Sequence, residues 1–277
     1  MGLFHFFKKN NQAEPKKEKS TSENPSTSIS REQMHDALTS AIDDRDFNEI
    51  QTLMSAVTRD NAPSIYLALN FEDSWFPEKG YDRIIDRMAH NQFVDLNETK
   101  DGKTPLTMIA EACHNATAIY ARIVESLLKG GADANKTDNL GWSALAYTIN
   151  KHGVSPTIIQ KLIDAGSNLN LVVESDDFIG LNERSILGMA YYNNKDFFAQ
   201  LKEKGAVMTD EEIEEMCNLL RDGLRAGGMG FSSTWSSSHN DHTGVPVPSR
   251  HGSRKELIAL CAVVEEFPGT TLEFIPA

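Results

Sequence analysis

Apolar residues recur at helical spacing in pairs of short segments along most of this chain. The clearest pair lies within residues 101–135, where each of two short helices is marked by an apolar stripe: Leu106, Ile109 and Ala110, then Ile119, Ile123 and Leu127. Two such helices cannot bury both apolar faces on their own. The pattern therefore predicts neighbouring helix pairs of the same kind, with Leu128 buried between consecutive pairs.

The ends of this unit carry helix start and stop signals. Thr104 can cap the first helix by accepting a backbone N–H bond, and Pro105 suits the first helical position because its missing N–H costs nothing there. Gly131 can adopt the left-handed conformation that ends the second helix. The sequence thus predicts helices that begin near Pro105 and end just before Gly131.

Four other segments follow the same rhythm and predict further helix pairs: residues 38–57, 65–97, 141–170 and 185–206. In the second of them, residues 65–69 are expected to lie in the first helix. The closing glycines Gly131, Gly166 and Gly205 are 35 and 39 residues apart. This regular spacing indicates one structural unit repeated along the chain.

The unit that opens with Thr104-Pro105-Leu106 and closes with Ala132-Asp133-Ala134-Asn135 resembles an ankyrin repeat. The resemblance implies an all-α ankyrin-repeat solenoid of about five helix pairs across residues 31–208. The unit that opens at Ser185 departs most from the family pattern. The family binds other proteins, so the resemblance implies a protein partner.

Residues outside this region have a different composition. Residues 1–30 are predicted to form a disordered tail, because they are rich in Lys, Glu, Ser and Asn. A short apolar patch at residues 1–9 is compatible with a frayed end or with contact to a membrane or partner. Residues 209–277 are predicted to form a helical C-terminal extension, with a flexible Gly/Ser/His loop at about 226–253.

The overall composition narrows the classes of function. The formal net charge of −13 over 277 residues argues against a nucleic-acid partner, because phosphate contacts need clustered Lys and Arg. No apolar run approaches the roughly 18 residues that span a bilayer, so no stable membrane insertion is expected. Three widely spaced cysteines favour reduced core thiols and a cytoplasmic protein.

Catalytic and metal chemistry have little support in the sequence. His239, Asp241, His242 and His251 are the strongest candidates for metal ligands, but their spacing matches no known ligand motif. A solvated polar loop is the simpler interpretation. The serines nearby lack a Gly-x-Ser-x-Gly elbow, so no catalytic residue, metal or other cofactor is expected.

The ankyrin resemblance implies a concave binding surface formed by the hairpin tips and the first helix of each unit. The matching positions are Lys100, Asp101, Lys103, Glu111, Asn139, Leu140, Trp142, Asn150, Arg184 and Tyr192. Trp142 has two open interpretations. It is either an exposed aromatic anchor for a partner, or it packs on the adjacent hairpin near Leu140 or Phe178.

Two classes of function remain. The first is a non-catalytic interaction module. Within it, the tail with acidic Glu265 and Glu266 followed by Glu273-Phe274-Ile275 resembles the C-terminal translocation signals of type IV-secreted bacterial effectors. That resemblance implies secretion into a host cell. The alternative is an enzyme that uses the repeats for targeting and residues 209–277 for catalysis. Such a short extension with a flexible middle is a poor scaffold for an active site.

Overall fold

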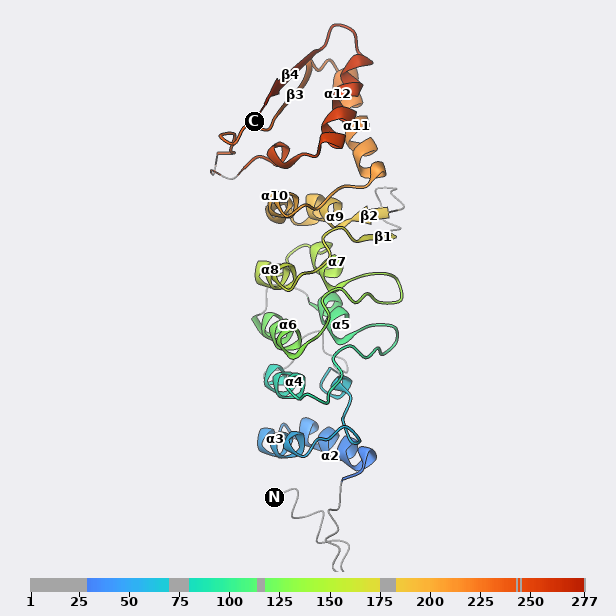
Figure 1. Cartoon of the computed structure of the whole chain (residues 1–277), viewed down its shortest axis with the longest axis vertical. Coiled ribbons are helices and arrows are strands. Elements are labelled where there is room, and N and C mark those ends of the chain that lie inside the picture. Colours follow the sequence, from blue (N-terminus) through green and yellow to red (C-terminus); the bar gives the residue numbers. More distant parts are fainter. Residues whose placement is uncertain are drawn as a thin grey trace, which may run out of the picture.

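The computed structural model describes residues 29–69, 80–113, 118–174, 183–242, 244 and 246–276. The chain is mainly helical, and its helices lie one above another along the long axis of the molecule (Figure 1). The predictions about residues 1–28 and about Phe178 concern parts of the chain outside the described residues.

Helices in the first two thirds of the chain form successive pairs. Their bounds are α2 (Arg31–Asp43) and α3 (Phe47–Ser55), the 3-10 turn η1 (Ile65–Leu67) and α4 (Tyr81–Ala89), α5 (Pro105–Ala112) and α6 (Ala118–Gly130), α7 (Ala144–Ile149) and α8 (Pro156–Asp164), α9 (Ile186–Asn193) and α10 (Lys195–Glu203). The helix predicted over residues 65–69 is therefore only a single 3-10 turn. The turn starts at Ser64, whose hydroxyl accepts a hydrogen bond from Tyr66 N. It ends at Ala68, whose backbone N–H donates to Ile65 O.

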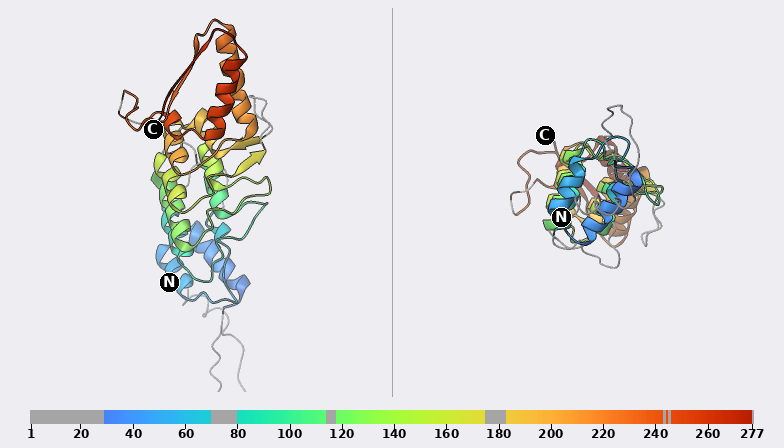
Figure 2. Two further views of the ribbon diagram at one scale, coloured as in Figure 1. Left: turned by 45° about the horizontal axis from the view of Figure 1, so that its top comes forward. Right: turned by 90° about the horizontal axis from the view of Figure 1, so that it is seen from below.

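Helices of neighbouring pairs pack on each other in two columns. The helices α4, α6 and α8 form one column and α5, α7 and α9 the other (Figures 1 and 2). Their facing sides build one continuous core that runs from Met34 to Ala206. Leu127 on α6 is fully buried in this core, whereas the neighbouring Leu128 is half-buried against it.

Capping side chains fix where these helices begin. The Thr104 hydroxyl accepts a bond from Thr107 N at 3.1 Å, and Pro105 occupies the first helical position, as predicted. Ser143 and Ser185 cap α7 and α9 in the same way. A Ser or Thr hydroxyl thus caps the first helix in three consecutive pairs.

An asparagine at the end of two consecutive units bonds to the unit that follows. Asn97 donates to Gly131 O at 3.1 Å and accepts from Asp133 N at 2.8 Å. One unit later, Asn135 donates to Gly166 O at 3.0 Å and accepts from Asn168 N at 2.6 Å. The same connection, made 38 residues further along the chain, shows that these units repeat in structure as well as in sequence.

The C-terminal extension contains two helices, two strands and a short turn: α11 (Asp210–Arg225), β3 (Gly230–Thr234), η2 (Pro248–His251), α12 (Arg254–Glu265) and β4 (Thr271–Ile275). Strands β3 and β4 pair in parallel, with Phe231 opposite Leu272. A second, antiparallel pair joins β1 (Val172–Glu174) to β2 (Glu183–Ser185).

These strands correct two expectations. The chain is not all-α, and the stretch at 226–253 is not a loop throughout, because it contains β3 and η2. Aromatic and β-branched residues favour the pairing: Trp235, next to β3, packs edge-on against Phe274 of β4 with ring centroids 5.2 Å apart. The predicted helices after Thr209 and from Arg254 are both present.

Glu212 joins the extension to the last helix pair. Its buried carboxylate accepts bonds from Ser185 N (2.9 Å), Ser185 Oγ (2.6 Å) and Thr209 N (2.8 Å). Gly188 leaves room for it, because a Cβ at that position would lie 1.8 Å from Glu212 Oε1. The start of α11 is therefore tied directly to the start of α9.

Candidate functional site

The first predicted hairpin tip is a tight turn before α5. Asp101 and Gly102 both have positive φ, 52° and 80°, as in the type I′ turns that close hairpins. Lys100 and Lys103 flank the turn and exchange backbone bonds of 3.0 Å in both directions. The tip is thus a defined hairpin, and Lys100 and Asp101 are exposed on it.

The next tip, before α7, is organised by Asp138. One carboxylate oxygen accepts from Leu140 N and Trp142 N, each at 2.9 Å, and the other accepts from the Tyr147 hydroxyl. Asp138 is buried, whereas Leu140 at the point of the turn is 71% exposed. The tip therefore holds a large apolar side chain in solvent on a fixed backbone.

Consecutive tips contact each other. Asn139 N donates to Gly102 O at 3.1 Å. A Cβ at Gly102 would lie 2.0 Å from the Asn139 side chain, so this approach needs the glycine for its space as well as for its φ. Residues 100–103 and 138–142 thus form one continuous edge, which we call the tip edge.

A polar and aromatic cluster lies directly behind the tip edge. Lys103 forms an ion pair with Glu111, and its Nζ lies 5.8 Å from the ring centroid of Tyr147. The Tyr147 ring packs on Trp142 with centroids 5.2 Å apart. Burial raises the pKa of Tyr147, and its bond to the Asp138 carboxylate raises it further. Tyr147 therefore stays a neutral hydrogen-bond donor at neutral pH.

Trp142 supports the tip and is not a fully exposed anchor. It is half-buried, and it packs against the main core and Tyr147. Leu140, not Trp142, is the exposed apolar side chain of this turn. The interpretation of Trp142 as a freely exposed aromatic anchor is therefore wrong, because the ring packs against Tyr147 and the core.

The remaining predicted residues lie apart from the tip edge. Asn150, at the end of α7, accepts from Asn193 Nδ2 at 3.0 Å, so it links two units. Tyr192 donates to Glu215 at 3.0 Å, and burial, followed by this bond, raises its pKa to about 12. Arg184 was expected at the surface, but it is 2% exposed, with its guanidinium 4.6 Å above the Tyr192 ring.

The burial of Arg184 follows from its place in β2. The residue pairs with Val173, which is also buried, and strand alternation turns both side chains inward. Arg184 is therefore withdrawn as a binding residue. The structure joins Lys100, Asp101, Lys103, Glu111, Asn139, Leu140 and Trp142 in one region, and it places Asn150, Arg184 and Tyr192 elsewhere.

No model of a known protein family matches this chain. A search of curated proteins finds no match either.

Sequence reasoning missed two residues that organise the tip edge, Asp138 and Tyr147. The signal was present, since an Asp two residues before Leu140 and three before Gly141 is typical of an Asx turn. Tyr147 could not be found in the same way, because its partner lies nine residues away across the turn.

The described residues also bear on metal binding, on thiol reactivity and on membrane crossing. Within the described ranges, no group of three or more His, Cys, Asp and Glu side chains is placed to hold a metal ion. Burial raises the pKa of each thiol, Cys113, Cys217 and Cys261, which lowers their reactivity. Across the same ranges, every helix is too short or too polar to cross a bilayer.

Removing the Asp138 carboxylate should loosen the tip edge. We expect Asp138→Ala to lower the free energy of unfolding by about 1–3 kcal/mol, because two backbone N–H groups and a tyrosine hydroxyl lose their acceptor. Hydrogen exchange at the Leu140 and Trp142 amides should accelerate. Asp133→Ala is the matched control, because exposed Asp133 accepts one bond, from Asn135 N. Equal effects of the two changes would contradict the role given to Asp138.

Proposed function

We propose that residues 31–208 form ankyrin-type repeats and that the protein acts by binding a partner protein, without catalysis, along the tip edge. The recurring Asn97 and Asn135 links and the Thr104-Pro105 helix start support the repeat assignment. Repeats that contact only their neighbours present extended surfaces, which such proteins use for binding.

One observation carries this proposal: Leu140 is 71% exposed on a turn that Asp138 holds in place. Exposing a leucine on a mobile loop would be unremarkable. A rigid turn, however, avoids part of the entropy loss that ordering a loop on binding would cost. Exposed Lys100 and Asp101 lie on the adjoining turn and supply polar contacts around this apolar point.

An interaction-capture experiment tests the proposal. Leu140→Asp should lower the affinity for the captured partner at least about tenfold, equal to about 1.4 kcal/mol, because it places a charge at the apolar point. Since Leu140 is exposed, the melting temperature should stay unchanged. Ile258→Asp is the matched control, because Ile258 is 61% exposed on α12, far from the tip edge.

Trp142→Ala separates support from direct contact. Because the ring packs against Tyr147 and the core, we expect this change to lower the melting temperature as well as the affinity. If Leu140→Asp retains every partner while Ile258→Asp loses one, the binding surface lies on the C-terminal extension and the proposal fails.

Secretion is not part of the proposal. Residues 273–275, the last part of the tail that resembles a translocation signal, belong to strand β4 and pair with β3. A secretion receptor that reads an extended tail would first have to separate the two strands.

A further inference from the structure

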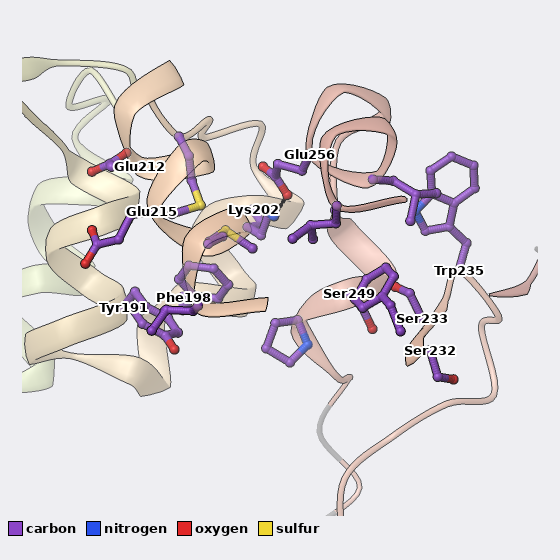
Figure 3. Close-up of a pocket in the computed structure, with 18 of the residues that line it drawn as sticks. Tyr191, Phe198, Lys202, Glu212, Glu215, Ser232, Ser233, Trp235, Ser249 and Glu256 are labelled. Carbon is purple, nitrogen blue, oxygen red and sulfur yellow. Dashed lines mark hydrogen bonds and ion pairs between the residues drawn. The ribbon is translucent and has the colours of Figure 1, made fainter. Parts of the chain in front are cut away.

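A cavity of about 250 Å³ lies between the last helix pair and the C-terminal extension. Tyr191 and Phe198 lie on one side of it, and Ser233, Ser249 and Trp235 on the other (Figure 3). Methionine, leucine and aromatic side chains form most of the wall, among them Met208, Met216 and Leu257. Mainly apolar walls with a few polar groups are typical of binding pockets.

The cavity runs along one edge of β3. Phe231, Ser232 and Ser233 all line it. Successive side chains of a strand point to opposite faces, so residues of both faces border the cavity, as expected for a cavity beside the strand. Strand β4 occupies the opposite edge and contributes no residue to the lining.

This edge of β3 has no partner strand among the described residues. Among the described residues, the backbone groups of Gly230–Thr234 form backbone hydrogen bonds only with β4. Two strands alone make a marginal sheet, and parallel strands are usually covered on both faces. An open edge beside an apolar cavity has the features of sites where an extended peptide adds as a strand and places a side chain in a pocket.

The interior of the cavity calls for an uncharged side chain. Lys202 and Glu256 form an ion pair at its wall, and each side chain is only 5% exposed (Figure 3). The Lys202 Nζ also lies 5.5 Å from the Phe198 ring centroid. These two charges therefore compensate each other. Glu212 and Glu215 also line the cavity, and they accept hydrogen bonds from Ser185, Thr209 and Tyr192. An aromatic or large aliphatic group fits the apolar part of the wall.

The surroundings favour basic flanking residues. Residues 209–277 contain eleven acidic and five basic residues. Glu273 is exposed on β4, directly opposite Ser232 of β3, and forms no ion pair among the described residues. A peptide that carries Lys or Arg would be attracted to this part of the chain.

We propose that the cavity and the open edge of β3 bind an extended peptide segment of a partner protein. The peptide adds as a third strand, its central aromatic or large aliphatic side chain fills the cavity, and Lys or Arg residues flank that side chain. This site is separate from the tip edge and does not depend on it.

The test uses the full chain and synthetic seven-residue peptides. The central residue is Gly, Ala, Leu or Phe, and the flanking residues are Lys or Glu. Binding is followed by NMR of methyl-labelled methionines, because Met208 and Met216 line the cavity while Met34 and Met88 are buried in the helix-pair core. Of these four methionines, we expect the signals of Met208 and Met216 to shift and those of Met34 and Met88 to stay unchanged.

The affinities of the peptides should depend on the central side chain and on the charge of the flanking residues. Peptides with central Phe or Leu and Lys flanks should bind at least tenfold more tightly than those with central Ala or with Glu flanks. N-methylation of alternate backbone amides should abolish binding on one of the two possible registers, because it removes the donors that pair with β3. If no peptide binds, or if N-methylation leaves the affinity unchanged on both registers, the proposal is wrong.

A pair of variants locates the site. Ser249→Trp should fill the cavity and lower peptide affinity at least tenfold, whereas Ser237→Trp, at an exposed position outside the lining, should not. Leu140→Asp should leave peptide binding unchanged, so failure of this site and failure of the tip edge can be told apart. Equal binding by Ser249→Trp and the unmodified chain would overturn the proposal.

Discussion

Lys202→Met is expected to lower the free energy of unfolding by about 3–5 kcal/mol, because it leaves the Glu256 carboxylate buried without its cation. Both side chains of the pair are only 5% exposed. The pair also connects α10 to α12, so its loss should loosen the extension from the last helix pair. Denaturant unfolding followed by circular dichroism measures the change.

A second substitution serves as the control. The double variant Lys202→Met/Glu256→Gln should recover most of the loss, because a neutral amide removes the unpaired charge. The amide oxygen also keeps the acceptor that Glu256 offers to Ser253 N at the start of α12. If the single variant is as stable as the unmodified chain, Lys202 and Glu256 are not buried as a pair.

Leu127→Ala is expected to lower the free energy of unfolding by about 2–5 kcal/mol through lost burial and the cavity left behind. Leu127 is fully buried on α6, which packs on both α4 and α8. Since units contact mainly their neighbours, the loss should appear first as local unfolding around α6. Hydrogen exchange resolved by segment, together with denaturant unfolding, distinguishes local from global loss.

Leu128→Ala provides the comparison, because Leu128 is half-buried on the same helix. The sequence predicted Leu128 to be buried between consecutive units, and the structure places it only partly there. A smaller loss than for Leu127→Ala is therefore expected. A larger loss for Leu128→Ala would mean that the face of α6 assigned to the core is wrong.

Much of the helical part of the fold could be predicted from the sequence, because its signals are local. Thr104 and Thr209 cap their helices as expected. The closing glycines Gly131, Gly166 and Gly205 all have positive φ. Capping and chain reversal depend on a few neighbouring residues, so the sequence contains the information directly.

The strands could not be predicted in this way. β3 and β4 are parallel partners about 40 residues apart, and neither is stable without the other. The sequence of β3, which contains Gly230, Ser232 and Ser233, has the composition of a loop. The cavity beside β3 depends on the same long-range pairing, so it was missed for the same reason.

The candidate site was predicted in part. The positions of the two turns were expected from the ankyrin resemblance, and Asp101-Gly102 and the residues around Gly141 are also local turn signals. The roles within the turns were not, since they depend on contacts across space. The sequence does not show that Trp142 packs against Tyr147. It also does not show that Arg184 lies in β2, where the pairing with β1 turns its side chain inward.

Hydrogen exchange of the protein with and without its captured partner tests the central claim most directly. If the tip edge is the binding surface, exchange should slow in residues 98–113 and 137–150 when the partner is added. Residues 31–55, at the far end of the helix stack, should be unaffected. Protection confined to residues 31–55 or 209–276, with the tip edge unchanged, would contradict the account.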